Sequence, residues 1–226
     1  RTAARLRALT RPRGEVRVVP HGVDNAHFSP DEPTVGFDAA VCARLGINSP
    51  YLLHVGTLEP RKNVPGLIAA FDAIADEDKE LSLVLAGVPA WGAKDARRAA
   101  QRARAGSRVM VLGFVDYDDL PPLLRRATVL AYPSFSEGFG LPALEALACG
   151  VPLVTSNDTV MADLAGDAAV LVDPHDVTSI AKGLEIATHV DAGAATRRAR
   201  GLEVASAFTW KRSIDGHLDA LVAATR

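Results

Sequence analysis

Two glutamates, Glu137 and Glu145, stand eight residues apart in the segment SFSEGFGLPALEALACG, residues 134–150. Glu145 lies among Leu, Ala and Cys on a stretch with helical character. Removing an unpaired carboxylate from water costs several kcal/mol. We therefore expect one of two environments for Glu145. Either it emerges at a cleft, where it can meet a ligand, or it forms a hydrogen bond to a fixed backbone or arginine partner.

The turn that leads from Glu137 into this helix has the composition of a ligand-facing loop. Gly138 and Gly140 permit a positive φ and a close approach of the backbone to a ligand. Pro142 suits the first turn of a helix, where its missing N–H costs nothing. We predict that the helix runs to about residue 149 and that Gly150 ends it.

A second candidate site is the loop GTLEPRKN, residues 56–63, which follows an apolar run. Arg61 and Lys62 directly precede a predicted helix that Asn63 can cap and that has Pro65 in its first turn. Two cations beside free backbone N–H groups and the positive end of a helix dipole favour an anion, most obviously phosphate. An exposed basic loop without a ligand is the alternative.

A third loop, GFVDYDDL at residues 113–120, has the composition of any strand-to-helix turn, with Asp116 as a candidate helix cap. The sequence predicts no metal site, because the six histidines are not spaced as ligands and acids near a helix N-terminus are common. It predicts no serine nucleophile either, since Ser134 and Ser136 lack the required setting. His54 lies inside an apolar run, which favours a satisfied core histidine.

The elements that must position these loops are short apolar runs alternating with helical segments. Such runs, separated by helices of about 10–15 residues, predict βαβ units and a parallel sheet covered on both faces. The chain is therefore predicted to be an α/β protein, with the three loops at the edge where parallel sheets bind ligands. The predicted strands are residues 16–19, 51–57, 81–87, 108–113, 128–133, 151–156 and 168–173.

Three helical segments are predicted near the C-terminus, at about residues 176–190, 193–207 and 210–225. The last one carries an apolar stripe of the kind that faces a core, formed by Trp210, Ile214, Leu218 and Leu221/Val222. We expect this stripe to pack against the present domain or against a missing one.

The 226 residues, with 48% hydrophobic and 23% charged residues, are typical of a soluble globular protein. A net charge of −2 gives no reason to expect a nucleic-acid partner. The two widely separated cysteines suit a reducing, cytoplasmic setting. The chain begins with Arg1 and has only two methionines, so we expect a fragment of a longer protein.

Two basic stretches lie outside these loops. Residues 1–14 have the character of a helix end that belongs to an absent N-terminal half. Residues 94–108 carry several arginines, and the simpler interpretation is a solvated helix face. Contact with an anionic membrane surface or acceptor is the alternative.

Taken together, these motifs resemble the retaining nucleotide-sugar glycosyltransferases of the GT-B group, which includes bacterial mannosyltransferases, sucrose synthases and glycogen-synthase-like enzymes. Glu137 and Glu145 in EGFGLPALE match the E-x7-E motif of that group. The order and spacing of four further stretches agree, and the resemblance covers almost the whole chain from Arg17. These stretches are VRVVPHGVD (16–24), LLHVGTLEPRKNVPGLIAAF (52–71), LVLAG (83–87) and ACGVPLVTS (148–156).

The resemblance implies a fold and a set of donor contacts. GT-B proteins have two Rossmann-like halves, and this chain is similar to the C-terminal, donor-binding half. By this resemblance Glu145 binds the ribose hydroxyls, and Glu137 faces the transferred sugar. Arg61 and Lys62 neutralise the diphosphate and assist its departure. The remaining implied donor contacts are Gly56, Thr57, the base-binding loop Gly113, Phe114 and Val115, and the turn residues Gly138, Phe139, Gly140 and Leu141.

One position departs from the pattern. Many members carry an arginine directly after the glycine at the end of the strand that leads into the basic loop, where this chain has Thr57. The positive charge that this arginine would place beside the diphosphate is therefore assigned to Arg61. The group generally needs no metal or other cofactor, and this chain offers no clear nucleophile.

The sequence thus predicts a Rossmann-like, nucleotide-sugar-binding donor domain at residues 15–207. Residues 1–14 are predicted to be the end of the missing N-terminal half, and the C-terminal helix at 208–226 is predicted to pack toward that half. The donor is a nucleotide sugar, and the EPRKN loop favours GDP-mannose. The acceptor, a glycan or lipid-linked glycan, should lie on the missing half, so this fragment alone is expected to be inactive. We expect a cytoplasmic location, at the inner face of the membrane if the protein makes peripheral membrane contact. The alternatives are a GT-B phosphorylase or epimerase relative, or a non-catalytic nucleotide-binding or interaction module.

Overall fold

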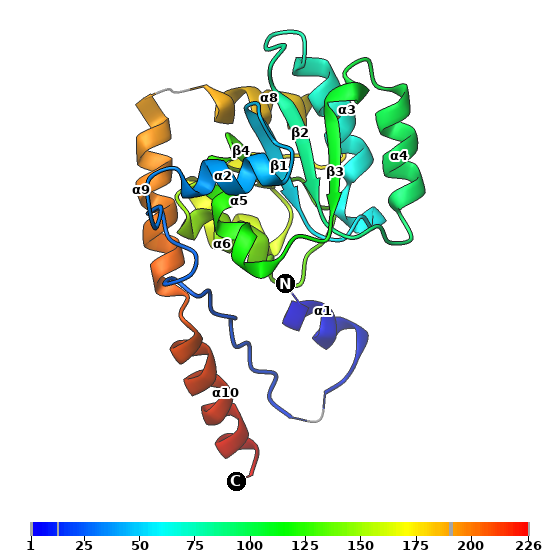
Figure 1. Cartoon of the computed structure of the whole chain (residues 1–226). Coiled ribbons are helices and arrows are strands. Elements are labelled where there is room, and N and C mark those ends of the chain that lie inside the picture. Colours follow the sequence, from blue (N-terminus) through cyan, green and yellow to red (C-terminus); the bar gives the residue numbers. More distant parts are fainter. Residues whose placement is uncertain (1, 13, 190–191, 226) are drawn as a thin grey trace.

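The computed structural model describes residues 2–12, 14–189 and 192–225 (Figure 1). In this part of the chain, six parallel strands form one sheet in the order β3-β2-β1-β4-β5-β6. The predicted α/β fold is confirmed. The order reverses between β1 and β4, the position at which open parallel sheets place their ligands. The strands are β1 (Tyr51–Val55), β2 (Ser82–Ala86), β3 (Val109–Gly113), β4 (Val129–Tyr132), β5 (Leu153–Ser156) and β6 (Val170–Val172).

Helices cover both faces of the sheet (Figure 1). One face is covered by α3 (Val64–Ile74), α4 (Ala93–Arg102) and α8 (Val177–Thr188). The other is covered by α2 (Phe37–Arg44), α5 (Leu120–Arg126) and α6 (Leu141–Ala148). The remaining helices are α1 (Thr2–Leu9), α7 (Val160–Ala165), α9 (Ala192–Ala207) and α10 (Trp210–Ala224).

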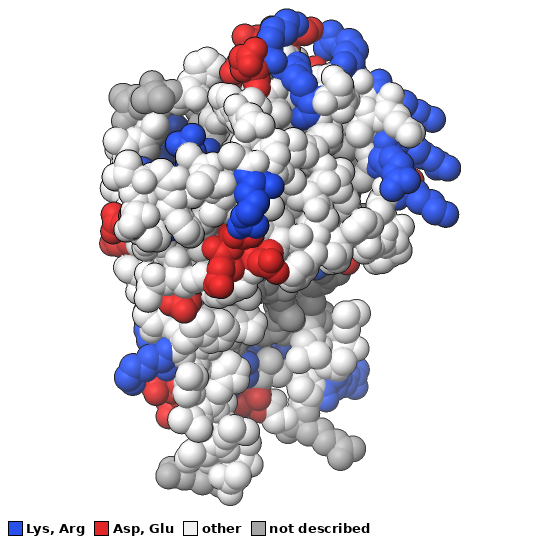
Figure 2. Space-filling model, viewed as in Figure 1, with Lys and Arg blue, Asp and Glu red and all other residues white. Residues whose placement is uncertain are grey.

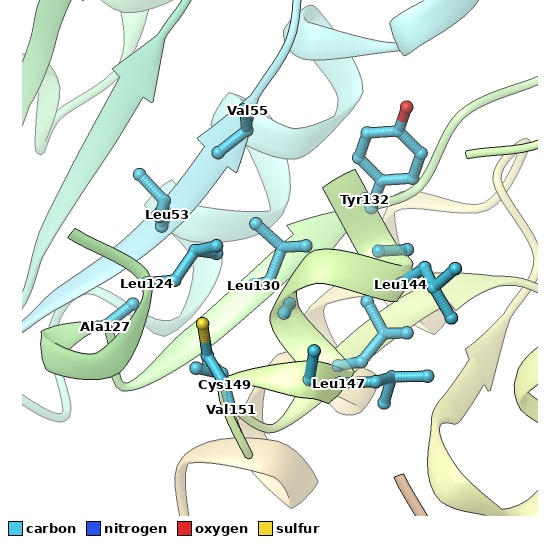
Figure 3. Packing of buried hydrophobic residues seen from close by; sticks show 14 of the residues in the cluster. Leu53, Val55, Leu124, Ala127, Leu130, Tyr132, Leu144, Leu147, Cys149 and Val151 are labelled. Carbon is cyan, nitrogen blue, oxygen red and sulfur yellow. The ribbon is translucent and has the colours of Figure 1, made fainter. Parts of the chain in front are cut away.

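The central strands β1 and β4 are buried throughout, because their side chains alternate between two covered faces. Leu53 and Val55 of β1 enter the cluster beneath α5 and α6, while Leu52 enters the cluster beneath α3 and α8. Leu130 and Tyr132 of β4 join Leu53 on the α6 side (Figure 3). Burying one such leucine contributes about 1.5–3 kcal/mol, so the two clusters hold the strand ends, and the loops that follow them, in fixed positions.

Six of the seven apolar runs are strands, but residues 16–19 are not. This segment has no strand partner in the described part of the chain and instead runs beside α10. Val19 packs so closely on Gly216 that a Cβ there would lie 2.9 Å from it. The prediction of a strand was wrong because an apolar run shows that a segment is buried or extended, but not whether a neighbouring strand exists.

The two predicted helix caps were also wrong in their side-chain role. Asn63 does precede α3, but its side chain makes no capping bond, and its backbone is left-handed at φ 56°. Its amide donates instead to the carbonyls of Pro133, at 3.1 Å, and Pro174, at 2.7 Å. Asp116 likewise makes no side-chain cap. At Asn63, hydrogen bonds from the side-chain amide to the carbonyls of distant loops therefore take the place of the local capping bond.

The three C-terminal helices are confirmed as α8, α9 and α10. The apolar stripe of α10 stays largely exposed, at 46–65% for its five residues, although Trp210 lies beside His21 with 6.2 Å between the ring centres. Figure 1 shows α10 leading away from the sheet. Residues 1, 13, 190, 191 and 226 lie outside the described part, so the predicted segments that include them are described only for the remainder.

Candidate functional site

The candidate site lies where β1 and β4 end side by side. The loop 56–63 follows β1, and the loop 133–140 follows β4. A backbone bond from the Phe135 N–H to the Arg61 carbonyl, 2.8 Å long, joins the two loops. The buried Asn63 amide fastens the same loops through Pro133. Two stretches some 70 residues apart in sequence are therefore held as one surface.

Glu137 binds both cations of the basic loop. One carboxylate oxygen lies 2.8 Å from Lys62 Nζ and the other lies 2.8 Å from a guanidinium nitrogen of Arg61. The side chains of Glu137 and Lys62 are only 5% and 6% exposed, whereas that of Arg61 is 42% exposed. Arg61 also contacts Glu59 at 2.6 Å. The sequence predicted these residues as parts of one donor site, and the structure brings Glu137 into direct contact with both cations.

Burial and pairing oppose each other in this cluster. Burial lowers the pKa of Lys62, and the bond to Glu137 offsets only part of that effect. Burial of Glu137 opposes its ionisation and is the largest single effect on its pKa. The hydrogen bond and charge of Lys62, with the charge of Arg61 among the smaller contributions, outweigh burial and hold the pKa below its ordinary value. We conclude that the two groups form an ion pair at neutral pH.

Tyr132, at the end of β4, completes the support of Lys62. Its hydroxyl accepts a hydrogen bond from Lys62 Nζ, and the ammonium lies 4.6 Å from the centre of the tyrosine ring. Burial raises the pKa of this hydroxyl. Sequence reasoning did not select Tyr132. Its position as the last residue of an apolar strand, directly before the glutamate turn, is the signal that could have done so.

These residues form the floor of an open cleft of about 510 Å³. Its walls are the turn and the first residues of α6, from Ser136 to Pro142. His21 also lines the cleft and packs against this turn, with its ring edge-on to Phe139 and 5.1 Å between the ring centres. His21 was also missed by sequence reasoning, although it lies in the VRVVPHGVD stretch that carried part of the resemblance.

The two glycines of the turn differ. Gly140 adopts φ 88° at the start of α6, and a Cβ there would lie 2.2 Å from the Met161 sulfur. Gly138 has no positive φ, and a Cβ added there would have no atom within 4 Å. Only Gly140 therefore needs to be glycine for the fold. Gly150 ends α6 with φ 70°, as predicted.

Glu145 lies outside the residues that line this cleft and has no hydrogen-bond or ion-pair partner among the described residues. Burial raises its pKa to about 7. Burial, then the charges of Asp24 and Glu145, raise the pKa of Tyr117, so the Glu145 carboxylate lies within electrostatic range of the loop after β3. Neither environment predicted for Glu145 is found within the described residues, because the side chain does not line this cleft and has no fixed protein partner.

The loop after β3 presents aromatic surface beside Glu145. Gly113 turns it with φ 76°, and Phe114 is 74% exposed, whereas Val115 packs partly on the core. Tyr117 is about half exposed and stacks on His27, with 4.2 Å between the ring centres. A nucleotide base could bind this surface, but the predicted base contacts stay predictions.

Three further sequence predictions concern the end of β1. Gly56 lies beside Lys62, where a Cβ would be 3.3 Å from the lysine side chain. The Thr57 hydroxyl donates to Glu59 at 3.2 Å, and neither Gly56 nor Thr57 lines the cleft. His54 is fully buried, with Nδ1 bonded to the Ala131 carbonyl at 3.0 Å. Its Nε2 has no partner among the described residues, so the histidine is only half satisfied, and burial lowers its pKa to about 4.

Over the described residues, no group of three His, Cys, Asp or Glu side chains is arranged to hold a metal ion. None of the helices described there is long and apolar enough to cross a membrane.

Residues 43–199 match the family described as "Glycosyl transferases group 1". This chain belongs to that family. O-antigen chain mannosyltransferase B of Escherichia coli is 39% identical over 162 residues, which are 71% of this chain and 42% of that protein. D-inositol 3-phosphate glycosyltransferase of Salinispora tropica is 35% identical over 222 residues, which are 90% of this chain and 45% of that protein.

Solved structures agree with the family assignment. The sucrose-phosphate synthase from Thermosynechococcus elongatus superposes with a TM-score of 0.81 and 28% identity, over 100% of this chain and 57% of that chain. The predicted relation to GT-B glycosyltransferases is thereby confirmed. This group 1 glycosyltransferase chain spans less than half the length of the two curated relatives named above.

Proposed function

We propose that this chain is the donor-binding half of a retaining glycosyltransferase that moves a sugar from a nucleoside-diphosphate sugar to an acceptor hydroxyl. The observation that carries the proposal is the cleft beside the N-terminus of α6, where Glu137 holds Arg61 and Lys62 at 2.8 Å. A helix N-terminus and two cations at one cleft favour a diphosphate. The unpaired carboxylate of Glu145, farther along α6, suits vicinal ribose hydroxyls, which donate to it.

The cations have different parts in this proposal. Lys62 is buried and held by Glu137 and Tyr132, so it supplies a charge whose position is fixed before the leaving diphosphate develops its own. Arg61 is 42% exposed and can leave Glu137 for an incoming phosphate. The four charged groups Arg61, Lys62, Glu59 and Glu137 sum to zero, so we expect the diphosphate to bind by displacing a carboxylate from Arg61.

We propose mannose as the transferred sugar and GDP-mannose as the donor. The support is the mannosyltransferase name of the relative that is 39% identical, together with the EPRKN loop. We propose that the glycan or lipid-linked acceptor binds a second half beyond this chain, toward which the exposed stripe of α10 is directed. The chain alone is then expected to bind donor and to transfer nothing.

Calorimetric titration of the chain with GDP, UDP, ADP and their sugar conjugates tests the proposal. We expect GDP and GDP-mannose to bind and to raise the melting temperature, since a ligand at a hundredfold excess over its Kd adds about 2.7 kcal/mol of stability. Absence of binding by every nucleotide at millimolar concentration would contradict the donor site. Preference for UDP or ADP would refute only the choice of base.

Glu145→Ala separates ribose binding from phosphate binding. Because Glu145 is proposed to accept from ribose hydroxyls, the substitution should weaken GDP by about tenfold or more, as for a lost pair of charge-assisted hydrogen bonds. Pyrophosphate, which has no ribose, should bind as before. Equal weakening of both ligands would indicate that Glu145 has a structural role instead.

A further inference from the structure

Helix α4 presents a face of exposed cations on the outside of the fold. Its alanines face the sheet, and Ala96 is only 3% exposed. The opposite side carries four exposed cations at helical spacing, which we call the basic face: Lys94, Arg97, Arg98 and Arg102. Figure 2 shows blue Lys and Arg side chains gathered at the edge of the molecule that α4 occupies in Figure 1. The whole chain has a net charge of −2, so the concentration of positive charge is local.

The basic face differs from the arginines that follow it. Arg104 pairs with Asp76 at 2.9 Å, and Arg108 donates to three backbone carbonyls. On the basic face, only Arg98 has an acidic neighbour within 4.0 Å among the described residues, namely Asp95 at 3.9 Å. The arginines beyond the helix thus stabilise the fold, whereas those on it keep their charge available to a partner.

Apolar surface lies directly beside these cations. Trp91, just before α4, is 78% exposed, and Val88 is 41% exposed. A groove of about 450 Å³ separates α4 from the edge strand β3. Its lining is largely apolar, including Val111, and Arg97 stands in its wall. Exposed tryptophan next to a row of cations is the pattern that peripheral proteins present to the headgroup region of a bilayer.

We propose that the basic face, together with Trp91 and Val88, docks this chain on a bilayer that contains anionic lipid. Each Lys or Arg held near such a surface is attracted by the negative headgroups, and the tryptophan enters the interface. A nucleic acid would use the cations but would leave the apolar groove unoccupied. The inference does not depend on the proposed function.

The surface is also linked to the candidate site. Gly92, which follows Trp91, packs so closely on Pro60 that a Cβ there would lie 2.8 Å from the proline ring. Leu58 and Pro89 form a bridge between the same two loops. Docking through Trp91 therefore brings the loop that carries Arg61 next to the membrane.

Sedimentation with vesicles tests the docking surface. The 226-residue chain is mixed with vesicles of phosphatidylcholine alone or with about a third phosphatidylglycerol. The test variant replaces every cation of the basic face: Lys94→Gln, Arg97→Gln, Arg98→Gln and Arg102→Gln. The control variant removes the same charge from scattered exposed sites: Lys79→Gln, Lys182→Gln, Arg200→Gln and Lys211→Gln.

We expect the unaltered chain to bind only the anionic vesicles. The test variant should lose about tenfold or more in partition coefficient, and the control should stay within about twofold, because attraction depends on charges near the surface. Equal losses in the two variants, or no binding to anionic vesicles, would overturn the proposal. The proposal would also be overturned if a short RNA displaced the chain from the vesicles while the amount bound did not depend on the anionic lipid content.

The fluorescence of Trp91 gives a second measurement, because its emission wavelength does not depend on the overall charge of the protein. The chain has two tryptophans, so Trp210→Phe leaves Trp91 as the only one. Anionic vesicles should shift its emission to shorter wavelength as the ring leaves water. An unchanged emission from protein that sediments with the vesicles would show that Trp91 does not enter the bilayer and would refute this docking mode.

Discussion

Replacing Glu145 by glutamine should make the chain more stable at alkaline pH. Burial raises the pKa of Glu145 from 4.5 to about 7, and no protein group within the described residues compensates the charge. Ionising this carboxyl in the folded state is therefore unfavourable. A glutamine has nearly the same shape and never ionises.

The sign follows from proton binding. Between pH 4.5 and about 7 the folded chain keeps the Glu145 proton, which the unfolded chain has already released. Unfolding thus becomes easier as pH rises through this window. With these two pKa values, Glu145 costs the chain roughly 2.5 kcal/mol of unfolding free energy between pH 5 and pH 8. Glu145→Gln removes this loss.

Urea unfolding of both proteins at pH 5 and pH 8 measures the effect. The stability of Glu145→Gln relative to the unaltered chain should grow by roughly 2.5 kcal/mol from the lower to the higher pH. Glu77→Gln, at an exposed glutamate far from the cleft, is the control and should show no such growth. A difference that stays constant within about 0.5 kcal/mol would refute the account of Glu145 as a desolvated, unpartnered acid.

The same reasoning gives a prediction for the proposed nucleotide-sugar donor. An ionised carboxylate can accept from both vicinal ribose hydroxyls, whereas a protonated carboxyl uses one oxygen as an O–H donor, so we expect the proposed donor to bind the deprotonated form of Glu145 more tightly. With a pKa of about 7, affinity should rise by up to about tenfold between pH 6 and pH 8, the increase in the ionised fraction of Glu145. In Glu145→Gln the affinity should be weaker and nearly independent of pH over this range.

Two further predictions concern the fold. Gly140→Ala should destabilise the chain by at least about 1–2 kcal/mol, because φ is 88° at this residue and the new Cβ would meet the Met161 sulfur. Gly138→Ala is the control and should leave the stability nearly unchanged. Equal melting temperatures for the two variants would contradict the turn geometry. Arg125→Ala should lower the free energy of unfolding in urea by about 3–5 kcal/mol. The substitution removes the arginine that binds Asp38 at 2.6 Å and leaves this carboxylate, whose side chain is only 4% exposed, without its partner. A loss below about 1 kcal/mol would show that the ion pair has little structural role.

Much of the fold was predictable because its signals are local. A buried parallel strand is an uninterrupted apolar run, and six such runs were found as strands. The run at 16–19 shows the limit, because its apolar residues pack beside α10 and no strand pairs with them in the described part of the chain. The helix caps were also predicted from local sequence. The prediction failed for the Asn63 side chain because its amide donates hydrogen bonds to the carbonyls of two distant loops instead.

The sequence by itself determined which chemical groups the candidate site can contain. The pair Glu137 and Glu145, the cations Arg61 and Lys62 and the turn at Gly140 are readable as residue types at fixed spacings. Only the tertiary structure decided how these groups are arranged. Glu137 binds Lys62 across 75 residues of chain, and Glu145 stands apart from both without a partner among the described residues. Which of these side chains meet depends on which strands end side by side at the sheet edge. That arrangement results from long-range packing, so no local sequence pattern can show it.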